Sequence, residues 1–124
     1  MQDRFKFRAW DKDNKKYIYD VQECLGYSGN ECDRCFGNIL DSLQYEVEQC
    51  TGLRDENGKL IYEGDIVQPN RMIFYSGISN LKICFHNGAF FAGTSLIDDS
   101  SKIMKVIGNI HENPELLGDE HNEN

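Results

Sequence analysis

Apolar and polar residues alternate near the N-terminus, where Phe5, Phe7 and Ala9 are separated by charged side chains. A period of two is typical of a β-strand with one buried face, so the pattern predicts a strand over residues 4–10. A polar, turn-forming stretch follows, and the apolar pattern resumes over residues 17–21. The sequence therefore predicts an N-terminal β-hairpin.

Two further hairpins are indicated by Asn57 and Asn87, each of which precedes a glycine and lies between apolar runs. Asn-Gly is the strongest short hairpin signal because both residues tolerate a positive φ. The first pair predicts a turn at residues 55–59. The second predicts a hairpin between strands at 81–85 and 89–92.

Gly64 and Asp65 precede two β-branched residues, an arrangement with which several small SH3-like barrels enter a strand. We expect the glycine to adopt a backbone conformation that residues with a side chain rarely adopt. We expect the aspartate to accept hydrogen bonds from nearby backbone amides. Further strands are predicted at residues 43–49, after a short helical piece, and at 105–107. Residues 94–102 are mostly polar and predict a loop.

These elements together predict a mainly β fold: a small SH3-like barrel or β-sandwich built from hairpins. At 124 residues the chain is expected to form a single domain with one core, over residues 1–118. Asn113 as cap, with Pro114 after it, predicts a short C-terminal helical turn. The acidic residues 119–124 predict a disordered tail.

The net charge is −8, and part of it comes from the end of the chain. From His111 onward there are five acidic residues and no Lys or Arg, so residues 1–110 carry 16 acidic against 13 basic side chains. This balance argues against nucleic acid as the main partner, since phosphate binding rests on Lys and Arg. No apolar run approaches the roughly 20 residues that span a bilayer, and the N-terminus shows no signal-peptide pattern. We expect a cytoplasmic protein without membrane contact.

One surface nevertheless combines basic and aromatic residues. The predicted N-terminal strand places Arg4, Lys6, Arg8 and Trp10 on one face, close to a lysine-rich turn. Basic residues beside an aromatic are typical of surfaces that bind single-stranded nucleic acid. They also occur on an exposed strand that is kept soluble and protected from pairing, and the acidic total together with Asp3, Asp11 and Asp13 favours this second interpretation. These four residues are the candidate binding site.

Four of the five cysteines, Cys24, Cys32, Cys35 and Cys50, lie close together in the sequence. Structural zinc sites usually pair two C-x-x-C units, or one such unit with two histidines, and here there is only one C-x-x-C. We therefore predict no metal site, although zinc binding by these four thiols stays open.

The common enzyme signatures are absent, among them the phosphate-binding loops, the zinc-protease helix and the nucleophile elbow. Glu63 and Asp65 have a spacing that could serve acid/base chemistry. Capping of a turn explains Asp65 without catalysis. We predict a protein that is not an enzyme and has no cofactor.

Three long blocks, in the same order along the chain, resemble the YopX family of phage and prophage proteins: residues 5–11, 51–67 and 106–117. The resemblance implies a small, largely β, phage-encoded protein in a bacterial cytoplasm, with no established activity to carry over. The cysteine-bearing segment 24–35 departs from the family pattern. The favoured function is a non-enzymatic interaction or assembly module, self-associating and acting on an unknown host or phage protein. The alternative is a nucleic-acid-binding accessory protein that uses the basic N-terminal strand.

Overall fold

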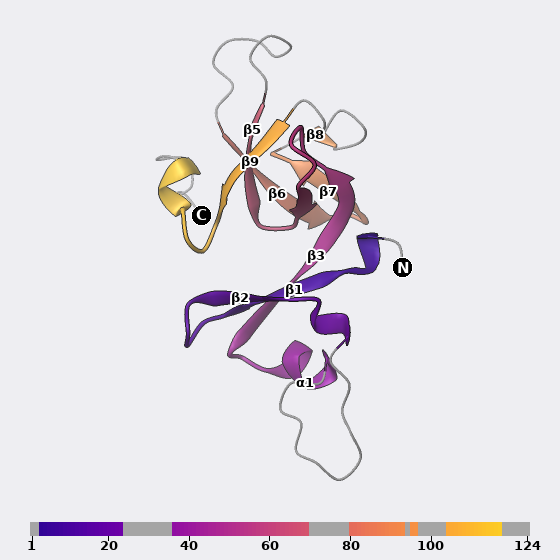
Figure 1. Cartoon of the computed structure of the whole chain (residues 1–124), viewed down its shortest axis with the longest axis vertical. Helices are drawn as coiled ribbons and strands as arrows, with labels where there is room; N and C mark the ends of the chain where they lie inside the picture. Colours follow the sequence, from indigo (N-terminus) through magenta and orange to yellow (C-terminus); the bar gives the residue numbers. More distant parts are fainter. Residues whose placement is uncertain (1–2, 24–35, 70–79, 94, 97–103, 118–124) are drawn as a thin grey trace. The chain divides into compact units, whose positions relative to one another are not determined.

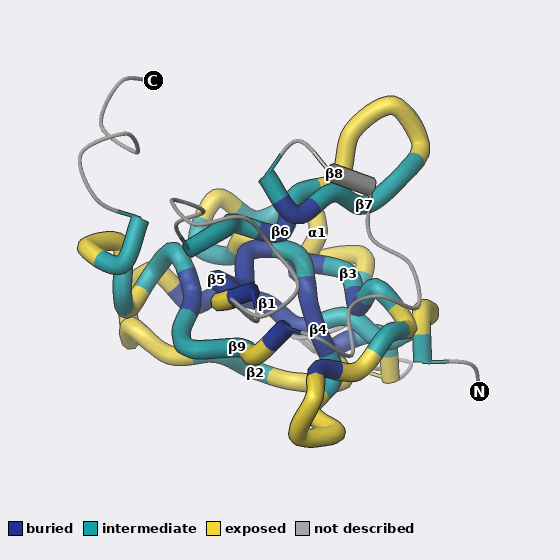
Figure 2. The backbone as a smooth tube through the Cα atoms, turned by 90° about the horizontal axis from the view of Figure 1, so that it is seen from above, coloured by how far each residue is buried: buried dark blue, intermediate teal, exposed yellow. Residues whose placement is uncertain are grey.

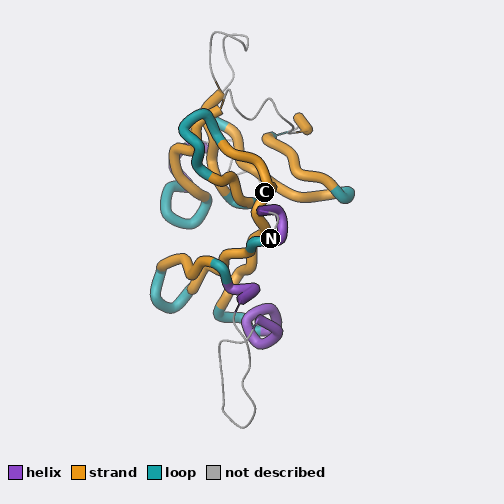
Figure 3. Tube along the Cα trace, turned by 45° about the vertical axis from the view of Figure 1, so that its right-hand side comes forward, coloured by secondary structure: helices purple, strands orange, loops and turns teal. Residues whose placement is uncertain are grey.

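The computed structural model describes residues 3–23, 36–69, 80–93, 95–96 and 104–117, and this part of the chain is mainly β, as predicted (Figures 1 and 3). Its strands are β1 (Phe7–Asp11), β2 (Lys16–Tyr19), β3 (Tyr45–Arg54), β4 (Leu60–Tyr62), β5 (Asp65–Pro69), β6 (Leu81–His86), β7 (Ala89–Ala92), β8 (Ser95–Leu96) and β9 (Met104–Asn109). Short helical pieces are the 3-10 helices η1 (Asp3–Phe5) and η2 (Val21–Glu23), the α-helix α1 (Phe36–Asp41) and a 3-10 turn at residues 114–117. The predicted disordered tail, residues 119–124, lies outside the described residues.

The strands form two sheets, and the chain divides into two compact units, Met1–Cys50 and Thr51–Asn124. The strand orders are β2-β1-β3-β4 and β8-β7-β6-β5-β9. Strand β3 begins in the first unit and ends in the second. Instead of the single core that we predicted, the described residues form two separate buried clusters, one in each unit. The number of domains stays a prediction.

The first cluster lies on one face of the sheet in the first unit. Ala9, Val21 and Ile39 are almost fully buried there, and they come from β1, η2 and α1. Ala9 stands opposite Ile18 on β2 and Val47 on β3, so the three strands present one apolar face to the two helical pieces. The strands of the first unit and its two helical pieces bury an apolar cluster of their own, so the described residues have two clusters instead of one.

The N-terminal strand is shorter than predicted. It begins at Phe7, because the Lys6 N–H donates to the Asp3 carbonyl over 3.0 Å and bends residues 3–5 into a 3-10 turn. Phe5 is accordingly 48% exposed instead of sharing the buried face. The hairpin itself is confirmed, since β1 and β2 pair in antiparallel register from Arg8 to Asp11.

Both Asn-Gly hairpins are confirmed. Gly58 has φ 84°, and Asn87 and its following glycine have φ 52° and 80°. Between them these turns connect β3 to β4 and β6 to β7. The second buried cluster is the core of the second unit and contains Ile61, Val67, Ile83, Ala92 and Met104. Figure 2 shows buried segments along β4 and β5 in dark blue.

The strand entry at Gly64 and Asp65 is also confirmed. Gly64 has φ 89°, its N–H donates to the Ile83 carbonyl, and its carbonyl accepts from the Ile110 N–H. Asp65 accepts a hydrogen bond of 2.8 Å from the Tyr62 N–H. This capping role accounts for a carboxylate that is almost completely buried.

The polar stretch 94–102, predicted as a loop, contains the short strand β8. It pairs with β7, with Ser95 opposite Ala92 and Leu96 opposite Phe91. Two residues are too few to show a period-two pattern, so this edge strand depends on its neighbour and not on its own sequence.

Candidate functional site

The predicted binding face is centred on Arg8 and Trp10 of β1, and both side chains are buried. The Arg8 Nε donates to the Glu48 carboxylate over 2.8 Å, and the Tyr17 hydroxyl donates to the same oxygen over 3.0 Å. The guanidinium carbon of Arg8 lies 4.0 Å from the centre of the Tyr17 ring. Trp10 packs edge-on against Tyr17, with 5.0 Å between ring centres.

This arrangement corrects the prediction of an exposed face made of four residues. Arg8 is 2% exposed, and its charge is compensated by Glu48, so little of it is available to an external phosphate. The sequence did not show this because Glu48 lies 40 residues away on β3, and pairing of β1 with β3 places it opposite Arg8. A buried charge requires such a partner, since an isolated one would cost several kcal/mol.

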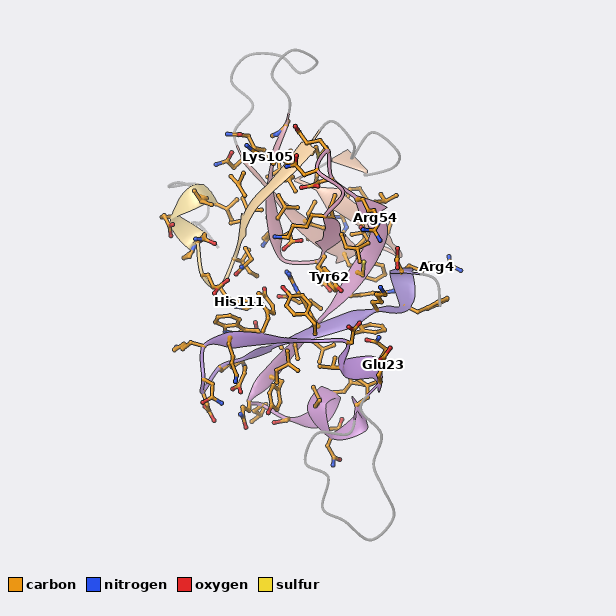
Figure 4. The ribbon with its side chains drawn as sticks, in the orientation of Figure 1. Arg4, Glu23, Arg54, Tyr62, Lys105 and His111 are labelled. Atoms are coloured by element: carbon orange, nitrogen blue, oxygen red, sulfur yellow. The ribbon has the colours of Figure 1, made fainter. Side chains whose placement is uncertain are left out.

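The other two residues of the predicted face lie before β1. The Arg4 guanidinium is 4.8 Å from the centre of the Phe5 ring, and its side chain projects outward (Figure 4). Lys6 forms an ion pair of 3.2 Å with Asp3. Both cations are accessible, but the structure does not align them with Arg8 and Trp10 in a strand.

The turn that connects β1 to β2 is organised by Asp11. One carboxylate oxygen accepts from the backbone N–H groups of Asp13 and Asn14, and the side-chain amides of Asn14 and Gln44 donate to the same group. The side-chain hydrogen bond from Asn14, and then that from Gln44, lower the pKa of Asp11 to about 2. The carboxylate is thus a structural acceptor in the turn.

Asp55 has a similar role in the β3–β4 turn. Its Oδ1 accepts from the Asn57 and Lys59 N–H groups, both over 2.9 Å, and its Oδ2 accepts from the Val106 N–H of β9 over 2.9 Å. Burial acts to raise the pKa of this carboxyl group, but the backbone hydrogen bonds from Val106, Lys59 and Asn57 outweigh it and hold the pKa below its usual value. The turn is therefore fastened to β9 as well as to itself.

In the third block that resembles the YopX family, residues 106–117, Gly108 packs closely against Asn113. A Cβ on Gly108 would lie 2.5 Å from the Asn113 Oδ1, so any larger residue would displace the Asn113 side chain. Asn109 accepts from the His111 and Glu112 N–H groups, and its amide donates to the Glu112 carboxylate. The resembling blocks thus carry residues that hold turns.

A surface that the sequence reading did not single out lies at the end of the β6–β7 hairpin. Phe85 is 46% exposed and stands directly opposite Phe90, with 4.8 Å between their ring centres. Phe90 packs against the core below. The signal was present, because aromatic residues flank the second Asn-Gly pair on both sides, but alternation alone does not show which of them is covered.

No group of three or more His, Cys, Asp or Glu side chains that could hold a metal occurs in the described ranges. Cys50 is buried and Cys84 is half-buried. The other three cysteines of the candidate zinc set, Cys24, Cys32 and Cys35, lie outside the described residues. The absence of a zinc site therefore stays a prediction. Within the described part of the chain, no helix is long and apolar enough to cross a membrane.

Comparison with known proteins agrees with the sequence resemblance. The family model described as YopX protein matches residues 6–118. The crystal structure of protein EF1440 from Enterococcus faecalis is similar with a TM-score of 0.65 and 31% identity, covering 90% of this chain and 96% of that one. The crystal structure of yopX from Bacillus subtilis is similar in fold, with a TM-score of 0.53 and 17% identity over 91% and 98%. No curated protein matches. The chain therefore belongs to the YopX family.

Proposed function

We propose that this protein is a phage- or prophage-encoded, non-enzymatic interaction or assembly module that self-associates and acts on a protein partner in the bacterial host cytoplasm. The observation that carries the proposal is the exposed Phe85 on the β6–β7 hairpin. Aromatic side chains provide much of the binding energy of protein interfaces, and an exposed one gains from being covered. The resemblance of the sequence blocks to a family of phage and prophage proteins is the support for a phage origin. The similar solved structures from Enterococcus faecalis and Bacillus subtilis support a bacterial host.

An SH3-like arrangement of the second unit is the finer part of this proposal. Its support is the strand order, in which the β5-β6-β7-β8 meander is joined at its first strand by the last strand, β9. The β3–β4 turn approaches β9, since the Glu56 N–H donates to the Met104 carbonyl and Asp55 accepts from Val106. Slow hydrogen exchange of the Glu56 and Val106 amides is expected if this closure holds in solution, and rapid exchange of both would contradict it.

Self-association through the hairpin is tested by replacing Phe85 with a charged residue. Light scattering across a concentration series is expected to show an oligomer for the natural chain and a monomer for Phe85→Glu. Leu43→Glu is the matched control, because Leu43 is 90% exposed and lies outside the hairpin. A natural chain that stays monomeric at every concentration, or equal dissociation of the two variants, would refute self-association at this surface.

The alternative, binding of nucleic acid by the basic N-terminal strand, loses its main structural basis. Two of its four residues, Arg8 and Trp10, are buried, and the Arg8 guanidinium is paired with Glu48. Arg4 lies over the exposed Phe5 ring, but neither it nor Lys6 is aligned with Arg8 and Trp10 in a strand.

A further inference from the structure

The second sheet has an outer face, opposite the face that packs on the core. Ile83 and Ala92 belong to the buried cluster, so side chains one position away on the same strands point to the other side. Residues directly opposite each other on paired strands share a face of the sheet. Ile66 therefore lies on the same side as Lys82, and Lys105 lies on the same side as Gln68. Ile66 lies on this side as well but is fully buried, so the face is covered at that position. We use "outer face" for six half-buried or exposed residues of this side: Gln68, Lys82, Cys84, His86, Phe91 and Lys105.

The charge of the outer face differs from that of the whole chain. The chain carries a net charge of −8, yet the outer face contains two lysines and neither Asp nor Glu among its described strand residues. Lys105, labelled in Figure 4, is exposed on the edge strand β9, and Lys82 lies two strands away on β6. A positive surface on an acidic protein complements an anionic partner.

An aromatic stack lies at the far end of the same face. The His86 ring is stacked on the Phe91 ring with 4.1 Å between centres and 9° between planes. His86 is exposed, so a further flat ring can continue the stack from its open side. The side-chain amide of Asn87 lies 3.3 Å from His86 Nδ1 and places hydrogen-bonding groups beside that position.

The spacing of these parts suits a strand of a few nucleotides. Phe91 on β7 and Lys105 on β9 are three strand-to-strand steps apart, or about 14 Å at roughly 4.8 Å each. The register also offsets them by two residues on β6 and two on β5, or about 13 Å along the strands. Proteins that bind single strands combine backbone-tracking positive charge with aromatic rings that stack on bases. The outer face has both of these features, whereas a purely electrostatic anion site would need no stacked rings.

We propose that the outer face binds single-stranded nucleic acid, with Lys82 and Lys105 contacting phosphates and the His86–Phe91 stack receiving a base. The site goes beyond the proposed interaction surface and is separate from it. Phe85 and Phe90 pair on the opposite, core-side face of the same hairpin.

The test is fluorescence anisotropy of a labelled oligothymidylate with the full chain at low salt. Lys82→Glu/Lys105→Glu is expected to weaken binding at least about tenfold and to reduce the slope of log K against log salt by about 1.4, for two lost phosphate contacts. Lys12→Glu/Lys16→Glu makes the same charge change at two exposed lysines, one in the β1–β2 turn and one at the start of β2, and is expected to alter binding by less than about threefold. His86→Ala is expected to weaken binding by roughly tenfold through the lost stacking.

Several outcomes would overturn the proposal: no binding at low salt, equal weakening by the two lysine pairs, equal competition by duplex DNA, or equal competition by polyglutamate. Circular dichroism melting checks that each variant is folded. If Lys82→Glu/Lys105→Glu is unfolded, Lys82→Ala/Lys105→Ala is used in its place. Phe85→Glu is expected to leave nucleic-acid binding unchanged, so failure of this site is distinguishable from failure of self-association.

Discussion

Replacement of Asp55 by alanine is expected to destabilise the fold by about 3 kcal/mol. Three backbone N–H groups lose a charged acceptor, and the aspartate that supplies it is only 5% exposed. The Asn57 and Lys59 amides belong to exposed turn residues that water can reach, so each loss costs about 0.5–1 kcal/mol. The Val106 amide lies in a half-buried strand and contributes about 1–2 kcal/mol, as much as the other two amides together.

Urea unfolding followed by circular dichroism measures this loss. With a slope of about 1.5–2 kcal/mol/M, the midpoint is expected to fall by roughly 1.5–2 M. Glu56→Ala is the matched control, since Glu56 is the next residue in the same turn and its side chain is exposed. If Asp55→Ala shifted the midpoint no more than Glu56→Ala does, the reasoning that this carboxylate fastens the turn to β9 would be wrong.

Two further predictions concern the first unit. Because the pKa of Asp11 is lowered to about 2, its contribution to stability is present above about pH 3.8 and is lost as the pH falls towards 2. Asn14→Ala is expected to raise the Asp11 pKa in a carboxyl NMR titration, and an unchanged midpoint would contradict the assigned cause. Glu48→Ala is expected to cost about 3–5 kcal/mol because it removes the carboxylate that faces buried Arg8. Adding Arg8→Met should restore much of that loss in thermal unfolding, whereas simple additivity of the two changes would refute the ion pair.

The local elements were predictable because each is specified by residues close together in the chain. Asn87 and the glycine after it adopt positive φ values that few other pairs tolerate, so the hairpin follows from two positions. Gly64 and Asp65 likewise specify the entry to β5, with an acceptor three residues from its donor. The family could also be identified, since its residue blocks hold these same turns.

The candidate site was not predictable in the same way, because burial depends on partners that are distant in the sequence. Alternation correctly placed Arg8 and Trp10 on the face opposite Ala9, but it could not show that Glu48 would compensate the arginine. The outer face of the second sheet likewise depends on register, which brings Lys82, His86 and Lys105 from two strands to one side. The sequence by itself determined the mainly β composition, the turns and the family. Only the tertiary structure decided the division into two buried clusters and which charged and aromatic side chains stay accessible, because strand pairing sets these through contacts tens of residues apart.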